Sequence, residues 1–267
     1  MIPRVTVITT VRSALFTGAF FATTAVMSII GAPVFLFFPQ PIGVGYTQLW
    51  GRVSLFLLRV LAGVRVEVRG LEHLPAGPAL IAAKHQSAFE TFALLPLLVC
   101  PTMVMKIELL KIPLFGAYSR MTGMILVDRT KGGVALRDMV QRGREETAKG
   151  RQIVIFPEGT RRPPGAPPAY QPGVAMLYKG LGIPTVPVAL NSGLFWPRRS
   201  FRKYPGTIVV EFLPPIEPGL DSKAFLKRME TAIEATGDRL LAEAADGPTP
   251  PPLPAEARAR LAAMGRG

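Results

Sequence analysis

One histidine and one carboxylate, His85 and Glu90, lie five residues apart near the start of a helix-forming stretch. His85 follows the apolar run 79–83, which is typical of a buried strand, and Ser87 with Glu90 three residues later is typical of a helix start. A neutral imidazole can take a proton as a general base, and a carboxylate bonded to one ring nitrogen leaves the other free for that proton. The segment therefore has the parts of a base and its orienting residue. The alternative is that Glu90 only caps the helix and His85 is a polar loop residue.

Cationic side chains follow three other strand-like segments. Arg161 closes a Pro/Gly turn that also carries Glu158 and Thr160, and a guanidinium fixed at the end of a strand is a bidentate receptor for phosphate. Lys106 and Arg129 each follow an apolar run. Because ligands usually bind at the carboxyl ends of the strands in an α/β sheet, we expect the three cations at one rim. The alternative for Arg161 is a solvated side chain in a surface turn.

Strand-like and helix-like segments alternate from residue 64 onward, which predicts an α/β sheet domain. Two prolines, Pro184 and Pro187, suit an edge strand or the start of a strand better than a central strand, here at 185–190. The predicted strands cover residues 64–68, 79–83, 102–105, 124–127, 152–156, 185–190 and 207–212, and the predicted helices cover 91–99, 133–149, 173–181 and 221–245.

The N-terminal part of the chain has the composition of a membrane segment. Residues 13–51 carry no formal charge, and 13–32 alone match the ~20 residues needed to cross a bilayer core. This run is much longer than the apolar region of a cleaved signal peptide, which has roughly 7–15 residues. Proline and glycine breakers at 31–33 and 39–45 leave two arrangements open, one span or a two-helix hairpin. A hairpin puts the arginines before and after it on the cytoplasmic side, as the positive-inside tendency favours.

These observations divide the chain into three parts. Residues 1–62 are expected to be membrane-attached helices, and residues 63–246 are expected to form the catalytic α/β domain. Residues 247–267 are rich in proline and basic residues, and we expect them to be disordered, either without a role or as a surface anchor.

The composition of the chain narrows the classes of molecule that the protein can bind. The 267 residues include 31 Lys and Arg against 18 Asp and Glu, for a net charge of +13, yet the mean hydropathy is +0.31. This combination argues against a nucleic-acid-binding protein and for one that meets anionic lipid head groups. The single cysteine, Cys100, excludes an internal disulfide, and the two histidines, His73 and His85, form no cluster with the spacing of metal ligands. We expect no metal and no other cofactor.

Four short motifs occur in order along the chain: His85 with Glu90, then GMILVDR at 123–129, FPEGTR at 156–161 and VPVA at 186–189. In this order, behind an apolar N-terminus, they resemble the motifs of the glycerolipid acyltransferase family, and within it most closely those of bacterial 1-acyl-sn-glycerol-3-phosphate acyltransferases. The resemblance covers roughly residues 64–241. It implies a mixed, largely parallel sheet flanked by helices.

The resemblance also implies roles for the site residues. His85 is expected to be the base and Glu90 the residue that orients it, although the family usually has Asp at that position. The turn around Arg161 is expected to bind the phosphate and glycerol of the acceptor, together with two other cations. The expected substrate-binding residues are Lys106, Arg129, Glu158, Gly159, Thr160 and Arg161.

The implied reaction transfers a fatty acyl group from a thioester to the sn-2 hydroxyl of 1-acyl-sn-glycerol 3-phosphate, which gives phosphatidic acid for phospholipid biosynthesis. In this reaction His85 takes the hydroxyl proton as the oxygen adds to the carbonyl and then protonates the leaving thiolate, without an acyl-enzyme. Main-chain N–H groups at the start of the helix near Ser87 are the expected oxyanion donors. The sequence leaves the acyl donor open between acyl-CoA and acyl carrier protein.

Two other functions stay open. The same chemistry could serve another acceptor, such as lyso-ornithine lipid or glycerol 3-phosphate. A non-catalytic protein that binds anionic lipid could use the aromatic and basic stretch 196–203, but it has no need of an imidazole near a carboxylate. The expected partners are the lipid bilayer, lysophosphatidate and the thioester donor, with no nucleic acid. The expected location is the bacterial inner (cytoplasmic) membrane, with the catalytic domain on its cytoplasmic side.

Overall fold

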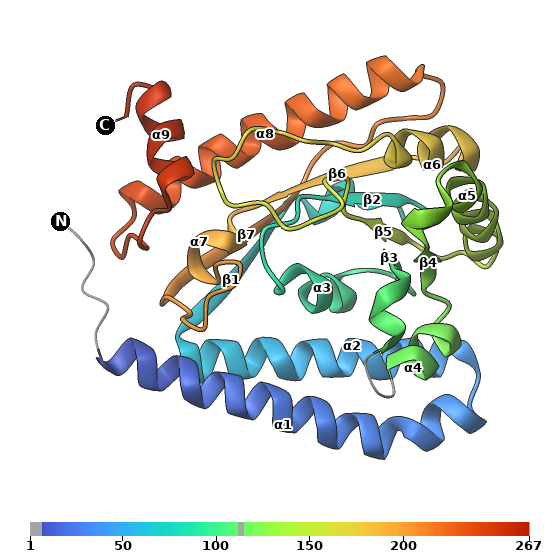
Figure 1. Ribbon diagram of the computed structural model, residues 1–267, viewed down its shortest axis with the longest axis horizontal. Coiled ribbons are helices and arrows are strands. Elements are labelled where there is room, and N and C mark those ends of the chain that lie inside the picture. The colour runs from blue at the N-terminus through green and yellow to red at the C-terminus, as the bar shows by residue number, and fades with distance from the viewer. Residues whose placement is uncertain (1–6, 112–114, 267) are drawn as a thin grey trace.

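A seven-stranded β-sheet forms the centre of the protein in the computed structural model, which describes residues 7–111 and 115–266 (Figure 1). The strands lie in the order β1-β7-β6-β2-β5-β3-β4. Each falls on one of the apolar runs in the sequence, with small differences at the ends. The strands are β1 (Val64–Arg69), β2 (Leu80–Ala83), β3 (Thr102–Lys106), β4 (Ile125–Val127), β5 (Ile153–Ile155), β6 (Thr185–Leu190) and β7 (Gly206–Phe212).

The sheet is mixed and mostly parallel, as the sequence predicts. β6, β2, β5, β3 and β4 run in one direction, so their carboxyl ends meet at one rim, whereas β7 pairs antiparallel with β6 and parallel with β1. Of the two positions expected for the prolines, the strand edge is wrong, because β6 lies between β2 and β7, whereas Pro184 does stand at the strand start, directly before Thr185. Pro187 fits there because pairing with β7 begins only at Val188, and the Pro187 carbonyl still accepts a hydrogen bond of 2.9 Å from the Leu213 N–H.

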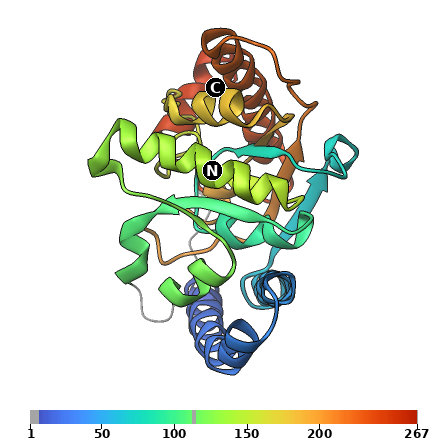
Figure 2. The same ribbon diagram turned by 90° about the vertical axis from the view of Figure 1, so that its right-hand side faces the viewer.

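Helices cover both faces of the sheet, so the central strands are buried on both sides. Within β2, Leu80 and Ala82 face one hydrophobic core, while Ile81 and Ala83 face the other. Figures 1 and 2 show the sheet between α8 on one side and the α1–α2 pair on the other. The first layer contains α5 (Gly133–Ala148), α6 (Gly173–Leu181) and α8 (Ser222–Asp246), and the second contains α1 (Val7–Phe37), α2 (Gln40–Leu57) with its continuation Leu58–Ala62, and α3 (Glu90–Ala93).

The helix predicted at 91–99 is shorter in the structure. α3 ends at Ala93, and a 3-10 turn at Leu95–Leu97 follows it, because Pro96 has no N–H to continue the helical hydrogen bonds. The remaining short elements are α4 (Phe115–Met121), α7 (Ser192–Phe195) and the 3-10 turns Leu71–His73, Ile107–Lys111 and Arg129–Lys131.

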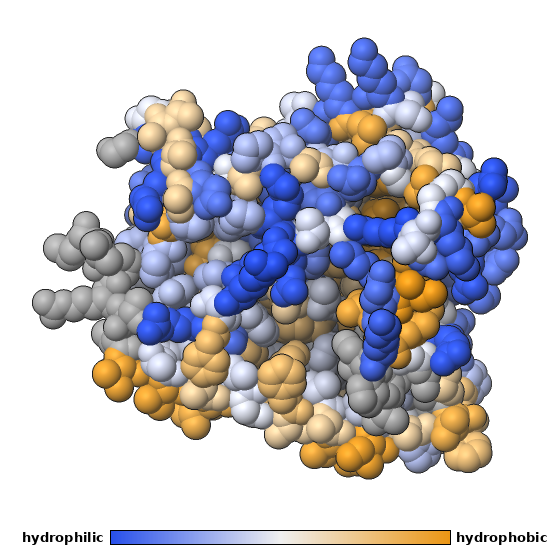
Figure 3. Space-filling view, in the orientation of Figure 1, coloured by the Kyte–Doolittle hydropathy of each residue, from blue (hydrophilic) through white to orange (hydrophobic). Residues whose placement is uncertain are grey.

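The N-terminal helices α1 and α2 form an antiparallel hairpin beneath the sheet, seen along its axis in Figure 2. The chain turns back between the two helices at Phe38 and Pro39. α1 contacts the domain near both ends, through Ser13 Oγ, which accepts from the Lys203 N–H at 2.9 Å, and through the Ser28 carbonyl, which accepts from the Tyr118 hydroxyl. Within the described part of the chain, α1 is the single helix long and apolar enough to cross a membrane, over Val7–Val34. The hairpin exposes large apolar side chains, including Val7, Ile8, Val11, Leu15, Phe21, Ile29, Ile30, Leu49 and Phe56, and Figure 3 shows hydrophobic residues gathered along this edge.

The expected disorder of the tail is wrong for Ala255–Ala263, which form helix α9. Ala257 and Leu261 lie four residues apart on one face of this helix, and both are buried in the core that also contains the end of α8. Arg260 on α9 pairs with Asp238 on α8. The two apolar residues and the ion pair fix the tail against the domain.

Candidate active site

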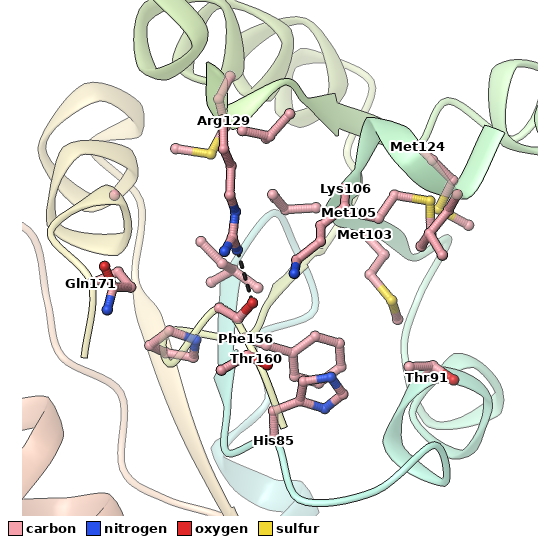
Figure 4. Close-up of a pocket in the computed structure, with 18 of the residues that line it drawn as sticks. His85, Thr91, Met103, Met105, Lys106, Met124, Arg129, Phe156, Thr160 and Gln171 are labelled. Atoms are coloured by element: carbon pink, nitrogen blue, oxygen red, sulfur yellow. Dashed lines mark hydrogen bonds between the residues drawn. The ribbon is translucent and has the colours of Figure 1, made fainter. Parts of the chain in front are cut away.

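A cavity of about 880 Å³ opens at the rim where the parallel strands end (Figure 4). Because β2, β3, β4 and β5 are parallel, the residues at and beyond their carboxyl ends meet there, as predicted for the cations. Figure 4 shows Lys106 and Arg129 extending toward the space beside the His85 ring. Six predicted site residues line the cavity, namely His85, Lys106, Arg129, Gly159, Thr160 and Arg161, whereas Glu90 and Glu158 do not.

His85 is held by its main chain and by stacking. Its ring lies on Phe156 with the two centroids 4.2 Å apart and the planes 18° apart, as Figure 4 shows. Its N–H donates to Glu158 Oε2 at 2.9 Å, and its carbonyl accepts from the Arg162 N–H at 2.8 Å. The ring nitrogen Nδ1 is buried and has no hydrogen-bond partner in the part of the chain that the structure describes. The FPEGTR turn and the residue after it therefore position the histidine, through Phe156, Glu158 and Arg162.

Burial and nearby positive charge lower the pKa of His85 from 6.5 to about 3. Desolvation is the largest cause, and the charges of Arg161, Lys106 and Arg198 follow. At physiological pH the ring is therefore neutral, which is the form that can accept a proton from a substrate.

Glu90 is fully buried and does not hydrogen-bond the His85 ring. Its Oε1 accepts from the main-chain N–H groups of Gln86 and Ser87 at 2.8 and 3.0 Å and from the Ser192 hydroxyl at 2.7 Å. Burial raises the pKa of Glu90 to about 7, while these hydrogen bonds oppose the rise. Glu90 therefore holds the loop before α3, partly through the Ser87 N–H that a helix cap would also use, and the expected contact with the His85 ring is absent.

Three of the N–H groups expected to stabilise an oxyanion are already bonded. Those of Gln86 and Ser87 donate to Glu90, and that of Phe89 donates to Ser87 Oγ at 3.2 Å. α3 is also a single turn, Glu90–Ala93, which gives it little dipole. The protein's own side chains therefore take the N–H groups of Gln86, Ser87 and Phe89, so these three are not available to an oxyanion.

Glu158 is buried behind the histidine loop, so the expectation that it binds substrate directly is wrong. Its Oε2 accepts from the His85 N–H, and its Oε1 lies 3.3 Å from the ammonium of Lys84, which is itself buried. Lys84 also pairs with Glu234 on α8 at 2.5 Å, and the Tyr170 hydroxyl donates to the same Glu234 oxygen. Glu158 therefore positions His85 and belongs to a buried network that reaches α8.

Arg129 lies against the FPEGTR turn. Its Nη2 donates to the Gly159 carbonyl at 2.9 Å, the bond drawn in Figure 4. Gly159 has a φ of +64°, and a Cβ built there would lie 2.7 Å from Arg129 Nη2. A glycine is required at this position both by the backbone conformation and by the close guanidinium.

The cavity also contains a cation that the sequence motifs do not include, Arg198. Its Nη1 donates to the Arg161 carbonyl at 2.7 Å, and its charge acts on His85. Lys106, Arg161 and Arg198 form no ion pair with any carboxylate in the described ranges. Their positive charge is therefore available to an anionic ligand. The sequence signal for Arg198 was the basic stretch 196–203, but nothing in it indicated that the stretch reaches the cavity.

Apolar side chains line the cavity on both faces of the sheet edge. On the hairpin side these include Trp50 of α2 and Met103 and Met124, and on the other side Leu136 and Met139 of α5. Aliphatic chains can therefore lie next to a cationic centre. No group of three or more His, Cys, Asp or Glu that could hold a metal occurs among the residues described.

Known proteins resemble this chain in sequence and in fold. Residues 65–191 match the family model described as Acyltransferase. A 1-acyl-sn-glycerol-3-phosphate acyltransferase from Pseudomonas aeruginosa is 38% identical over 196 residues, which are 73% of this chain and 76% of that protein. The chain belongs to the acyltransferase family.

More distant proteins resemble this acyltransferase as well. A 1-acyl-sn-glycerol-3-phosphate acyltransferase from Limnanthes alba is 31% identical over 171 residues, which are 63% of this chain and 60% of that protein. The crystal structure of a 1-acyl-sn-glycerophosphate (LPA) acyltransferase from Thermotoga maritima superimposes with a TM-score of 0.73 at 24% identity and covers 86% of this chain and 97% of the other. This structural match confirms the fold.

Substitutions at Glu90 separate a loop-holding role from an orienting one. Glu90→Gln keeps an oxygen that can accept from the Gln86 and Ser87 N–H groups, whereas Glu90→Ala leaves buried donors unpaired at a cost of about 1–3 kcal/mol each. We therefore expect each substitution to lower both the acyl-transfer rate and the free energy of unfolding. Glu90→Ala should lower both more than Glu90→Gln does. The measurement is urea denaturation and acyl-transfer rate on both variants. Loss of turnover in Glu90→Gln at unchanged stability would contradict the loop-holding role.

The titration of His85 should lie well below its ordinary range. Because burial and three cations disfavour the charged ring, the ring stays neutral as the pH falls below 6.5, and removing one cation should raise its pKa. His73→Gln leaves a single histidine, so NMR can follow the His85 ring without ambiguity. In that background Arg198→Gln should move the titration to higher pH, and Arg137→Gln, on the exposed side of α5, should not. A titration midpoint at or above 6.5 would disprove the inferred environment.

Proposed function

We propose that this acyltransferase moves a fatty acyl group from a thioester to the sn-2 hydroxyl of 1-acyl-sn-glycerol 3-phosphate and so produces phosphatidic acid. The observation that carries the proposal is the cavity itself. It combines one neutral histidine, unpaired cations and apolar walls, which match the hydroxyl, the phosphate and the acyl chains of the two substrates. The names of the relatives from Pseudomonas aeruginosa and Limnanthes alba support the same acceptor.

The proposed chemistry needs one proton carrier. The ring nitrogen of His85 that faces the cavity takes the hydroxyl proton while the hydroxyl oxygen forms a bond to the thioester carbonyl carbon. The carbon–sulfur bond then breaks, and the histidinium returns the proton to the leaving thiolate. The developing negative charge lies in the field of Lys106 and Arg161, because the N–H groups of Gln86 and Ser87 before α3 already donate to Glu90.

Arg161 and Lys106 are proposed to bind the acceptor phosphate. Arg161 follows the turn after β5 and Lys106 ends β3, and both charges act on the His85 ring, so a phosphate between them brings the glycerol hydroxyls close to the base. An arginine can bind a phosphate through two parallel hydrogen bonds, whereas a lysine contributes one charge. Thr160 adds a hydroxyl to the same wall.

The hairpin is proposed to lie in the cytoplasmic leaflet of the bacterial inner membrane, with the catalytic domain on the cytoplasmic side. Support comes from the exposed apolar side chains of α1 and α2 and from the contacts that tie α1 to the domain near both ends. Because Trp50 of α2 also lines the cavity, an acyl chain can pass from the bilayer to the base along α2. The donor is proposed to be the thioester of CoA or of acyl carrier protein, with no cofactor.

The direct test of the base is His85→Ala. We expect it to fold and to lose at least the 10²–10⁴-fold that general-base catalysis typically contributes. His73→Ala, in a 3-10 turn outside the cavity, is the matched control and should keep its turnover. The assay offers lysophosphatidate with acyl-CoA and with acyl carrier protein thioesters. Near-normal turnover of a folded His85→Ala protein would disprove the mechanism.

The phosphate assignment is tested at Arg161. Because a hydrogen bond to a charged group is worth about 1.5–3 kcal/mol, Arg161→Ala should weaken use of lysophosphatidate by roughly ten- to a hundred-fold, and Arg161→Lys should not restore it. Lyso-ornithine lipid, which has no phosphate, is the comparison acceptor, and Arg137→Ala on α5 is the control for lost charge. An equal loss with both acceptors would mean that Arg161 holds the loop and does not bind the phosphate.

A further inference from the structure

The loop between α7 and β7, residues 196–203, carries an unusual set of exposed side chains. We call it the basic loop. Arg198, Arg199 and Arg202 are exposed, and Phe201 has 49% of its surface exposed. The chain contains no Asp or Glu from residue 159 to residue 210, so no acidic neighbour in sequence offsets these charges. Among the described residues none of the three arginines forms an ion pair.

The basic loop is fixed to the hairpin at its carboxyl end. Ser13 of α1 accepts from the Lys203 N–H at 2.9 Å and donates to the Lys203 carbonyl at 3.3 Å. The buried Lys203 ammonium donates to Thr17 Oγ1 at 2.9 Å and lies 4.9 Å from the centre of the Trp196 ring. Trp196 in turn packs edge-on against Phe16, with ring centres 5.2 Å apart. These contacts therefore fix the position of the basic loop relative to α1.

The basic loop lies next to exposed apolar side chains of the hairpin. The N-terminal part of α1, next to Ser13, exposes Val7, Ile8, Val11 and Leu15. Figure 1 shows the loop between α7 and β7 close to this part of α1, and Figure 3 shows hydrophobic residues along the same edge. An exposed aromatic ring and arginines that border an apolar face are the combination that suits the head-group layer of an anionic bilayer.

We propose that the basic loop is a second membrane-contact site, in which Phe201 enters the head-group layer and Arg199 and Arg202 bind the phosphates of anionic phospholipids. This inference rests on the proposed membrane position of the hairpin. Arg198, in the same loop, reaches the cavity and bonds to the Arg161 carbonyl. The loop thus places the head-group phosphates next to the cations of the active site, and a lyso-lipid reaches Arg161 without leaving the membrane surface.

Vesicle flotation of the full-length protein tests the proposal. The two probes are vesicles of phosphatidylcholine alone and vesicles that also contain phosphatidylglycerol. Because each basic residue at an anionic surface contributes a several-fold increase in binding, Arg199→Gln with Arg202→Gln should weaken binding to the anionic vesicles by roughly ten- to thirty-fold at low salt, and should barely change binding to phosphatidylcholine. Phe201→Ser should weaken binding to both.

The matched control removes the same charge elsewhere. Arg137→Gln with Arg142→Gln on α5 lies on the sheet face opposite the hairpin, and both arginines are exposed. The proposal would be overturned if the two double variants weakened vesicle binding equally, or if the wild type bound vesicles with and without phosphatidylglycerol equally well. Either result would leave the proposed position of the hairpin intact. Failure of the wild type to bind either vesicle would overturn the hairpin position as well. Unchanged vesicle binding of the loop variant, with a loss of turnover confined to acyl carrier protein as donor, would show that the loop binds an acidic protein instead.

Discussion

Three consecutive main-chain N–H groups after β2 each donate to a buried carboxylate. The N–H of His85 donates to Glu158, and those of Gln86 and Ser87 donate to Glu90. The two carboxylates come from different parts of the chain and hold the loop from two sides. Because neither is solvated, the loss of either leaves buried donors without partners. The main chain around His85 is therefore held by these contacts in addition to the stacking of its ring on Phe156.

The same arrangement separates charge in the active site. The negative groups lie beneath the main chain, where Lys84 neutralises Glu158 and the hydroxyl of Ser192 bonds to Glu90. The cations remain on the cavity wall without carboxylate partners in the described ranges. The imidazole of His85 is kept neutral by its burial and by these cations, without a carboxylate at the ring. An anionic substrate that enters the cavity therefore meets a positively charged wall.

The sequence predicted the strands, their common rim and the cations there, because apolar runs followed by cations are local patterns and parallel strands end together. It did not predict what the carboxylates contact. A separation of five residues allows Glu90 to reach either the ring or the loop, and the choice is made partly by Ser192, which is 102 residues away. Lys84, the partner of Glu158, is 74 residues away. The tail was misjudged for a similar reason, because Ala257 and Leu261 form a helix only against the packed domain.

The single antiparallel pair in the sheet, β6 with β7, has a topological consequence. This pairing reverses β7 and β1 relative to β2. These two strands therefore begin at the rim where β2, β3, β4 and β5 end. The hairpin leads into β1 at Val64 and the basic loop leads into β7 at Gly206, and these two residues are register partners. The two elements proposed to contact lipid therefore enter the sheet side by side, at the edge that carries the cavity. If all seven strands were parallel, they would enter at the opposite edge, the length of the strands away from His85.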